Sequence, residues 1–116
     1  MLPVAKILIL EDNFARQTAF RRKLVGNVVE IVETSEGALR MLQDETWDEL
    51  YLDHDLGGQE FVESGPGTGY EVAVWLESHP EFKPGRIVLH SLNPAGRSRM
   101  AAALPEAEVI PWAWAW

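Results

Sequence analysis

The chain contains no cysteine among its 116 residues. Disulfide bonds, thiolate zinc sites and cysteine nucleophiles are therefore excluded. A long apolar run is missing as well, because no segment approaches the roughly 18 apolar residues of a membrane-spanning helix. The N-terminus also lacks the basic region, apolar stretch and cleavage site of a secretory signal. We therefore expect a cytoplasmic protein that has no membrane partner.

Basic residues are scarce. Ten Lys and Arg stand against 18 Asp and Glu, which gives a formal net charge of −8. A protein that follows a nucleic-acid backbone needs a basic stripe to displace counterions, so we do not expect broad binding of this kind. The charge does not exclude a single phosphate group, held locally by a metal ion and a helix terminus.

The size and the apolar pattern predict one α/β domain over residues 1–116, because this length is close to the commonest domain size. Short apolar runs, typical of strands buried on both faces, alternate with helical segments. The expected strands cover residues 7–10, 28–32, 50–52, 87–89 and 108–110. Repeated strand–helix units with apolar strands imply a parallel sheet covered by helices on both faces.

Capping residues mark the expected helix starts. Asn13, Ser35 and Asn93 each precede a helical segment, and side chains of this type cap the first turn of a helix. The glycine-rich stretch 57–69 should be a loop that ends with Thr68 as a further N-cap. Little chain remains after Ile110, so we expect the last helix to be missing or very short.

Acidic residues directly follow two of the predicted strands. Glu11 and Asp12 come after the first strand, and Asp53 follows the third. With strand order 2-1-3-4-5 these strands are neighbours, and ligands bind at their carboxyl ends. Converging carboxylates repel one another, and a hard cation such as Mg²⁺ or Mn²⁺ relieves that repulsion. We predict a divalent-metal site at Glu11, Asp12 and Asp53; the alternative is that these acids only cap helices and end turns.

This acid pattern resembles the receiver domains of bacterial response regulators. The motifs that carry the resemblance are Leu8–Asn13, Tyr51–Asp53 and Gly69. It implies a flavodoxin-like fold with a five-stranded parallel sheet, and Asp53 as the acceptor of a phosphoryl group. Two features depart from the receiver pattern. His90 stands where receivers have Ser or Thr, and residues 108–116 contain no lysine, although receivers have one at the end of the fifth strand.

Further motifs resemble the cyclic-phosphate-processing receiver family. They are Leu52–Gly58, Thr68–Tyr70, His90–Pro94 and Met100. The resemblance implies action on small phosphate ligands or on cyclic phosphate ends such as those of RNA. Opening a cyclic phosphodiester needs a base and an acid, and imidazole can serve as either. We therefore predict His54 and His90, with Asp53, as catalytic residues, and Ser91 and Asn93 as phosphate-binding residues.

Three functions stay open at this stage. The first is a metal-dependent phosphodiesterase. The second is a signalling receiver that is phosphorylated on Asp53, or a pseudo-receiver that only binds a partner. The third is a non-catalytic sensor of cyclic phosphates. The alternating tryptophans of Trp112–Trp116 could cover bare sheet surface or form a homodimer contact, since aromatic residues are enriched in interface cores.

Overall fold

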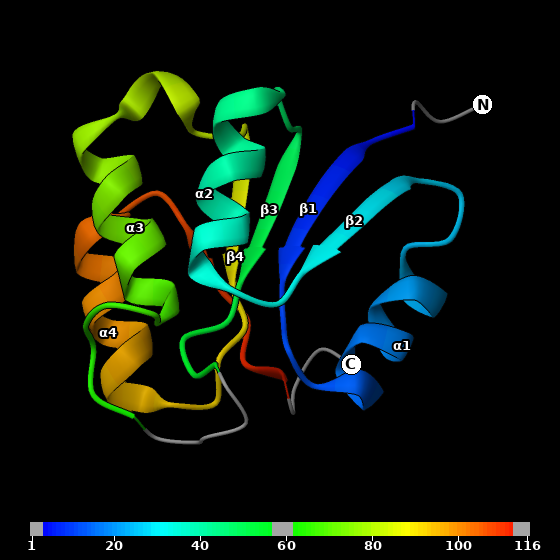
Figure 1. The fold of residues 1–116 in the computed structure, drawn as a ribbon. Coiled ribbons are helices and arrows are strands. Elements are labelled where there is room, and N and C mark those ends of the chain that lie inside the picture. Colours follow the sequence, from blue (N-terminus) through cyan, green and yellow to red (C-terminus); the bar gives the residue numbers. More distant parts are fainter. Residues whose placement is uncertain (1–3, 57–61, 113–116) are drawn as a thin grey trace.

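Five parallel strands form one sheet in the order β2-β1-β3-β4-β5. Figure 1 shows β2, β1, β3 and β4 in this order. The structure is a computed structural model that describes residues 4–56 and 62–112. The strands are β1 (Lys6–Leu10), β2 (Val28–Val32), β3 (Glu49–Leu52), β4 (Arg86–Leu89) and β5 (Glu108–Val109). The predicted α/β fold and its strand order are confirmed.

Helices cover both faces of the sheet, as predicted. They are α1 (Phe14–Lys23), α2 (Ser35–Asp44), α3 (Gly69–Ser78) and α4 (Pro94–Ala103), with a short 3₁₀ turn, η1 (Pro80–Phe82). Successive side chains of a strand point to opposite faces. Leu8 and Leu10 accordingly pack in the core under α2, α3 and α4, whereas Ile7 and Ile9 pack with Phe20 of α1. Within the described ranges, no helix is long and apolar enough to cross a membrane.

Three of the four predicted N-caps are confirmed: Asn13 and Asn93 with side-chain hydrogen bonds, and Thr68 as the N-cap of α3 without one. Asn13 Oδ1 accepts a hydrogen bond from the Arg16 amide at 3.0 Å, and Asn93 Oδ1 accepts one from the Gly96 amide at 3.0 Å. These bonds satisfy backbone donors that the first turn of a helix leaves without a partner. They also fix where α1 and α4 begin, directly beside the carboxyl ends of β1 and β4.

The prediction that Ser35 caps α2 is wrong by one residue. Thr34 is the N-cap, and its hydroxyl oxygen accepts a hydrogen bond from the Gly37 amide at 3.0 Å. Ser35 is already the first helical residue, and its hydroxyl donates to Glu71 of α3 at 2.8 Å. Both hydroxyls suit an N-cap chemically, so only the backbone path after β2 decides between them.

The face under α1 is completed by the chain that follows β5. The ring centroid of Trp112 lies 5.1 Å from that of Phe20, and Trp112 packs against the core cluster of this face. The predicted cover of the sheet by the tail therefore holds for Trp112. Trp114, Trp116 and the predicted homodimer contact lie outside the described residues.

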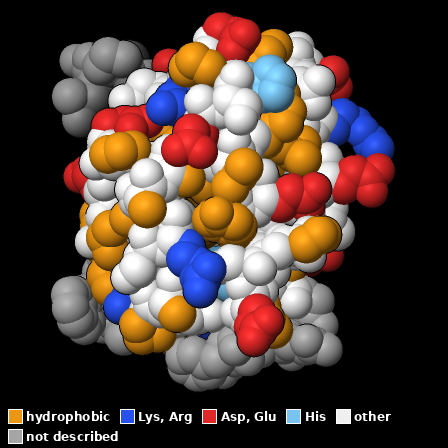
Figure 2. All heavy atoms as spheres, turned by 90° about the vertical axis from the view of Figure 1, so that its left-hand side faces the viewer, with side chains coloured by type: hydrophobic (Ala, Val, Ile, Leu, Met, Phe, Trp, Pro, Cys, Tyr) orange, Lys and Arg blue, Asp and Glu red, His pale blue; other side chains and the backbone are white. Residues whose placement is uncertain are grey.

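On the face over α3 and α4, basic side chains stand apart from one another among apolar and acidic ones (Figure 2). The described side chains of this face therefore form no continuous basic stripe of the kind that binding along a nucleic-acid backbone requires.

The start of α3 lies directly on the end of β3. The Gly69 amide donates to the His54 carbonyl oxygen at 2.9 Å. A β-carbon at position 69 would lie 1.7 Å from the carbonyl oxygen of Asp53, a distance that no real contact allows. Only glycine permits this approach, which holds in place the segment that carries Asp53.

We predict that Gly69→Ala lowers the free energy of unfolding by about 3 kcal/mol or more, because the added methyl group must push α3 away from β3. Gly65→Ala is the matched control, since a β-carbon there meets nothing within 4 Å. Urea unfolding measures both variants. Equal stabilities for the two variants would contradict the close approach.

Candidate functional site

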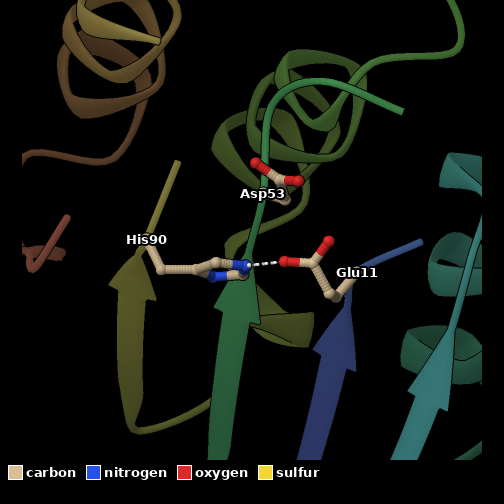
Figure 3. Close-up of side chains that lie close together, drawn as sticks. All are labelled: Glu11, Asp53 and His90. Carbon is tan, nitrogen blue, oxygen red and sulfur yellow. Dashed lines mark hydrogen bonds and ion pairs between the residues drawn. The ribbon is translucent and has the colours of Figure 1, made fainter. Parts of the chain in front are cut away.

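Three buried polar side chains meet at the carboxyl edge of the sheet (Figure 3). Glu11 follows β1, Asp53 follows β3 and His90 follows β4, so each comes from a different strand. One potential ligand atom from each residue lies within 4.8 Å of the other two. Their exposed fractions are 0%, 2% and 0%, respectively. Buried charges are costly unless they are paired, so these three side chains must balance one another's charge.

Glu11 and His90 are joined directly. His90 Nε2 lies 3.0 Å from Glu11 Oε1, although 79 residues separate the two in sequence. Glu11 Oε2 accepts a second hydrogen bond from the Asn13 amide at 3.0 Å. The His90 ring meets Phe20 edge-on at a centroid distance of 5.0 Å. The carboxylate and the aromatic ring together fix the orientation of the imidazole.

His90 Nδ1 is buried and has no hydrogen-bond partner within the described residues. Leaving a buried polar atom unsatisfied costs roughly 1–3 kcal/mol. Native structures contain few such atoms, and each calls for an explanation such as a catalytic role or a bound ion. The unsatisfied nitrogen lies in the same ring that contacts the acidic cluster.

The two carboxylates have pKa values displaced in opposite directions. Burial raises the pKa of Asp53 to about 6, helped by the charge of Glu11, although His90, Arg16 and a hydrogen bond from the His54 amide oppose the rise. Burial alone would raise the pKa of Glu11 too, but the hydrogen bond and charge of His90 hold it below its usual value. Such a divergence marks out one carboxylate that stays ionised and another that can carry a proton.

Arg16 is a site residue that the sequence analysis missed. One of its terminal guanidinium nitrogens lies 3.7 Å from Glu11 Oε1 and 3.7 Å from Asp53 Oδ2. Arg16 and Phe20 are four residues apart on α1, so they share the inward face of that helix. The guanidinium supplies positive charge to a site that lacks the receiver lysine.

The structure brings together two of the three predicted metal ligands. Glu11 and Asp53 converge, but Asp12 does not belong to the group whose ligand atoms lie within 4.8 Å of one another. Asp12 instead lines a surface pocket with Glu33 and Thr34. Two buried carboxylates, one with a raised pKa, form a donor set that fits a hard divalent cation. The complete ligand set stays a prediction.

His54 lies outside the Glu11–Asp53–His90 group, so the two histidines have separate partners. The His54 side chain is fully buried, and its Nδ1 lies 2.7 Å from Asp55 Oδ1. Its Nε2 lies 2.8 Å from the hydroxyl of Ser64. His54 thus has a hydrogen-bond network of its own, and its predicted catalytic role stays a prediction.

Ser91 and Asn93, the predicted phosphate ligands, are both buried. The Asn93 side-chain amide donates to Asp55 Oδ1 at 3.0 Å and to the Val62 carbonyl oxygen at 3.1 Å. The backbone amide of Asn93 donates to Ser91 Oγ at 3.1 Å. These bonds organise the start of α4. A role for the two side chains in phosphate binding stays a prediction.

A family model described as the cyclic-phosphate processing receiver domain matches residues 6–106. The chain belongs to this family. The buried cluster of Glu11, Asp53 and His90 lies within the matched residues. A comparison with curated proteins found no match.

Solved structures of response regulators share the fold. The cyanobacterial phytochrome response regulator RcpA, in phosphorylated form, has a TM-score of 0.71 and 22% identity over 94% of this chain and 81% of its own. TrrA from Thermotoga maritima, in complex with Mg²⁺ and BeF, has a TM-score of 0.71 and 21% identity over 94% of this chain and 89% of its own.

A response regulator from Burkholderia pseudomallei, with a phosphorylated aspartic acid, a calcium ion and citrate, has a TM-score of 0.67 and 16% identity over 90% of this chain. The receiver domain spans 58% of that protein's length. At these identities the comparisons establish the fold alone.

We predict that Asp53→Asn stabilises the protein above pH 6. A folded-state pKa of about 6, against an ordinary value of 3.8, means that ionisation of Asp53 destabilises the fold. The cost grows as the pH rises from about 4 to about 6 and then stays constant at about 3 kcal/mol. The asparagine side chain of the variant carries no charge and keeps an oxygen that accepts the His54 amide hydrogen.

Urea unfolding of the wild type and Asp53→Asn at several pH values measures this difference. The variant should be more stable at pH 7.5, and the gain should disappear as the pH falls towards 4. A gain that is equal at both ends of the range would contradict a raised pKa at Asp53.

Proposed function

We propose that this receiver domain hydrolyses a cyclic phosphodiester, in a small ligand or at an RNA end. The observation that supports the proposal is the buried group of Glu11, Asp53 and His90, in which an imidazole occupies the place of the receiver Ser or Thr. The family description points to the same chemistry. The absence of lysine from residues 108–116 argues against the usual receiver reaction on Asp53.

In the proposed reaction a water oxygen attacks phosphorus, and the bond from phosphorus to one ring oxygen breaks. Asp53, with a pKa of about 6, is ionised at neutral pH and takes a proton from the attacking water. His90, whose Nε2 lies 3.0 Å from Glu11 Oε1, gives a proton to the departing ring oxygen. Two groups with separate protonation states thus supply the base and the acid.

Charge on the phosphate also needs compensation. The Arg16 guanidinium lies between two carboxylates and is 17% exposed at its side chain, so it can reach a phosphate oxygen at the edge of the cluster. Glu11, Asp12 and Asp53 would hold Mg²⁺ or Mn²⁺. When bound, such a cation supplies charge neutralisation at the phosphate and a more acidic water.

We expect the protein, with Mg²⁺ or Mn²⁺, to convert a nucleoside 2′,3′-cyclic phosphate to a monophosphate. His90→Gln should lower the rate by ~10²–10⁴-fold, because it removes a positioned proton donor. His79→Gln is the matched control, since His79 stacks on Trp75 with ring centroids 4.4 Å apart and has no contact with the cluster among the interactions described. Liquid chromatography of the nucleotides measures turnover.

Equal activity of the two variants would contradict the assignment of His90.

A signalling receiver is the second candidate, because the fold is shared with response regulators whose aspartate is phosphorylated. Wild-type protein that lacks turnover, but gains an acid-labile phosphate on Asp53 from acetyl phosphate, would support that candidate instead.

We also predict that Mg²⁺ stabilises the wild type. A ligand that binds only the folded state at a hundred times its Kd adds about 2.7 kcal/mol. Glu11→Gln should abolish most of this gain, because it removes one charged oxygen donor from the cluster. Glu36→Gln, at a carboxylate that is 84% exposed, is the control and should keep the gain. Urea unfolding with Mg²⁺ and with EDTA measures the effect, and an equal gain in both variants would place the cation elsewhere.

A further inference from the structure

His54, Asp55 and Ser64 form a chain of hydrogen bonds that the proposed reaction does not use. Ser64 Oγ lies 2.8 Å from His54 Nε2, and Asp55 Oδ1 lies 2.7 Å from His54 Nδ1. A hydroxyl on one ring nitrogen and a carboxylate on the other is the arrangement that activates a serine nucleophile. The geometry is thus that of a nucleophile, a base and a group that orients the base.

The hydrogen bonds favour one tautomer of His54. An ionised Asp55 accepts hydrogen bonds, so the contact at Oδ1 favours the tautomer with the proton on Nδ1, in which Nε2 presents its lone pair to the Ser64 hydroxyl. Asn93 supports this arrangement, because its side-chain amide donates to the same Asp55 oxygen at 3.0 Å. The carboxylate is therefore held on the side of the ring away from the serine.

The His54 ring is also held sterically. A β-carbon at position 96 would lie 2.4 Å from Cγ of His54, so the ring lies directly against the backbone of α4. The ring is fully buried, so its surroundings fix its orientation. Ser64 differs, because it is partly exposed and lines a cavity of about 280 Å³.

This cavity can hold only a small ligand. Ala95 and Arg99 of α4 line it together with Ser64. In this turn Pro94 has no amide hydrogen and the Gly96 amide already donates to Asn93 Oδ1, so the Ala95 amide is the donor that the turn can offer. The guanidinium of Arg99 is a strong donor to an anionic oxygen. Ala95 and Arg99 line the same cavity as Ser64, so these two donors are the candidates to stabilise an oxyanion there.

We propose that Ser64 is the nucleophile of a second catalytic site, which hydrolyses a small carboxylic ester. The proposal goes beyond the cyclic-phosphate reaction and does not depend on it, since it uses no residue of the Glu11–Asp53–His90 group. Its site lies where the loop after β3 meets the start of α4.

In the first step, Ser64 Oγ bonds to the carbonyl carbon while its proton passes to His54 Nε2. The bond from that carbon to the alcohol oxygen breaks, and the alcohol leaves with the proton from Nε2. In the second step, water gives a proton to Nε2 and its oxygen bonds to the acyl carbon. The bond from that carbon to Oγ breaks, and Oγ recovers the proton.

A fluorophosphonate probe tests the proposal, because attack by Ser64 Oγ displaces fluoride and leaves a stable covalent adduct. We expect the native full-length chain in EDTA to gain one adduct, which peptide mass spectrometry assigns to Ser64. Ser64→Ala should lose it, and His54→Gln and Asp55→Asn should slow labelling by ~10²-fold or more. Ser78→Ala, at an exposed serine in the last turn of α3, is the control and should label like the wild type.

Unfolding curves of each variant show whether it is folded, so that slower labelling can be assigned to loss of the activated serine and not to loss of the fold. A native wild-type protein that gains no adduct at Ser64, while a known serine hydrolase is labelled in the same tube, would overturn the proposal and leave Ser64 as a structural clamp. Labelling of Ser64 that persists at the wild-type rate in folded Asp55→Asn would also overturn it. Neither result bears on cyclic-phosphate turnover, which is measured with Mg²⁺ or Mn²⁺ and a different substrate.

Discussion

One buried hydrogen bond, between Glu11 and His90, organises the functional edge of this fold. It joins the ends of β1 and β4 across the intervening β3, so it can form only if the sheet has its observed order. Both partners are fully buried, and removing either one would leave a polar or charged group without compensation. Asp53 follows the strand between them, and its raised pKa is a consequence of the same burial.

Helix α1 links this bond to the rest of the protein. Its Asn13 cap fixes the start of the helix, and one inward face then delivers Arg16 to the carboxylates and Phe20 to the His90 ring. The opposite side of the edge is organised by α4, whose backbone at Gly96 meets the His54 ring. His54 and His90 follow the neighbouring strands β3 and β4, but they belong to two separate hydrogen-bond networks.

Much of this arrangement could be predicted from the sequence. Apolar runs followed by acids indicate parallel strands with a polar edge, and the strand order brings Glu11 and Asp53 together. Side-chain direction could not be predicted in the same way. Arg16 enters the site because of the rotation of α1, and His54 turns to Ser64, ten residues further along a loop, because Gly96 leaves room for its ring. Thr34 and Ser35 are equally good caps by chemistry, and only the backbone path selects the first.

The central proposal is that the buried carboxylates Glu11 and Asp53 hold a divalent cation beside His90. A crystal structure from crystals soaked in Mn²⁺, with anomalous diffraction data, tests it most directly. We expect one anomalous peak within bonding distance of oxygens from both Glu11 and Asp53, with the His90 ring beside it. A peak confined to surface acids such as Glu36, or no peak near Asp53, would contradict it.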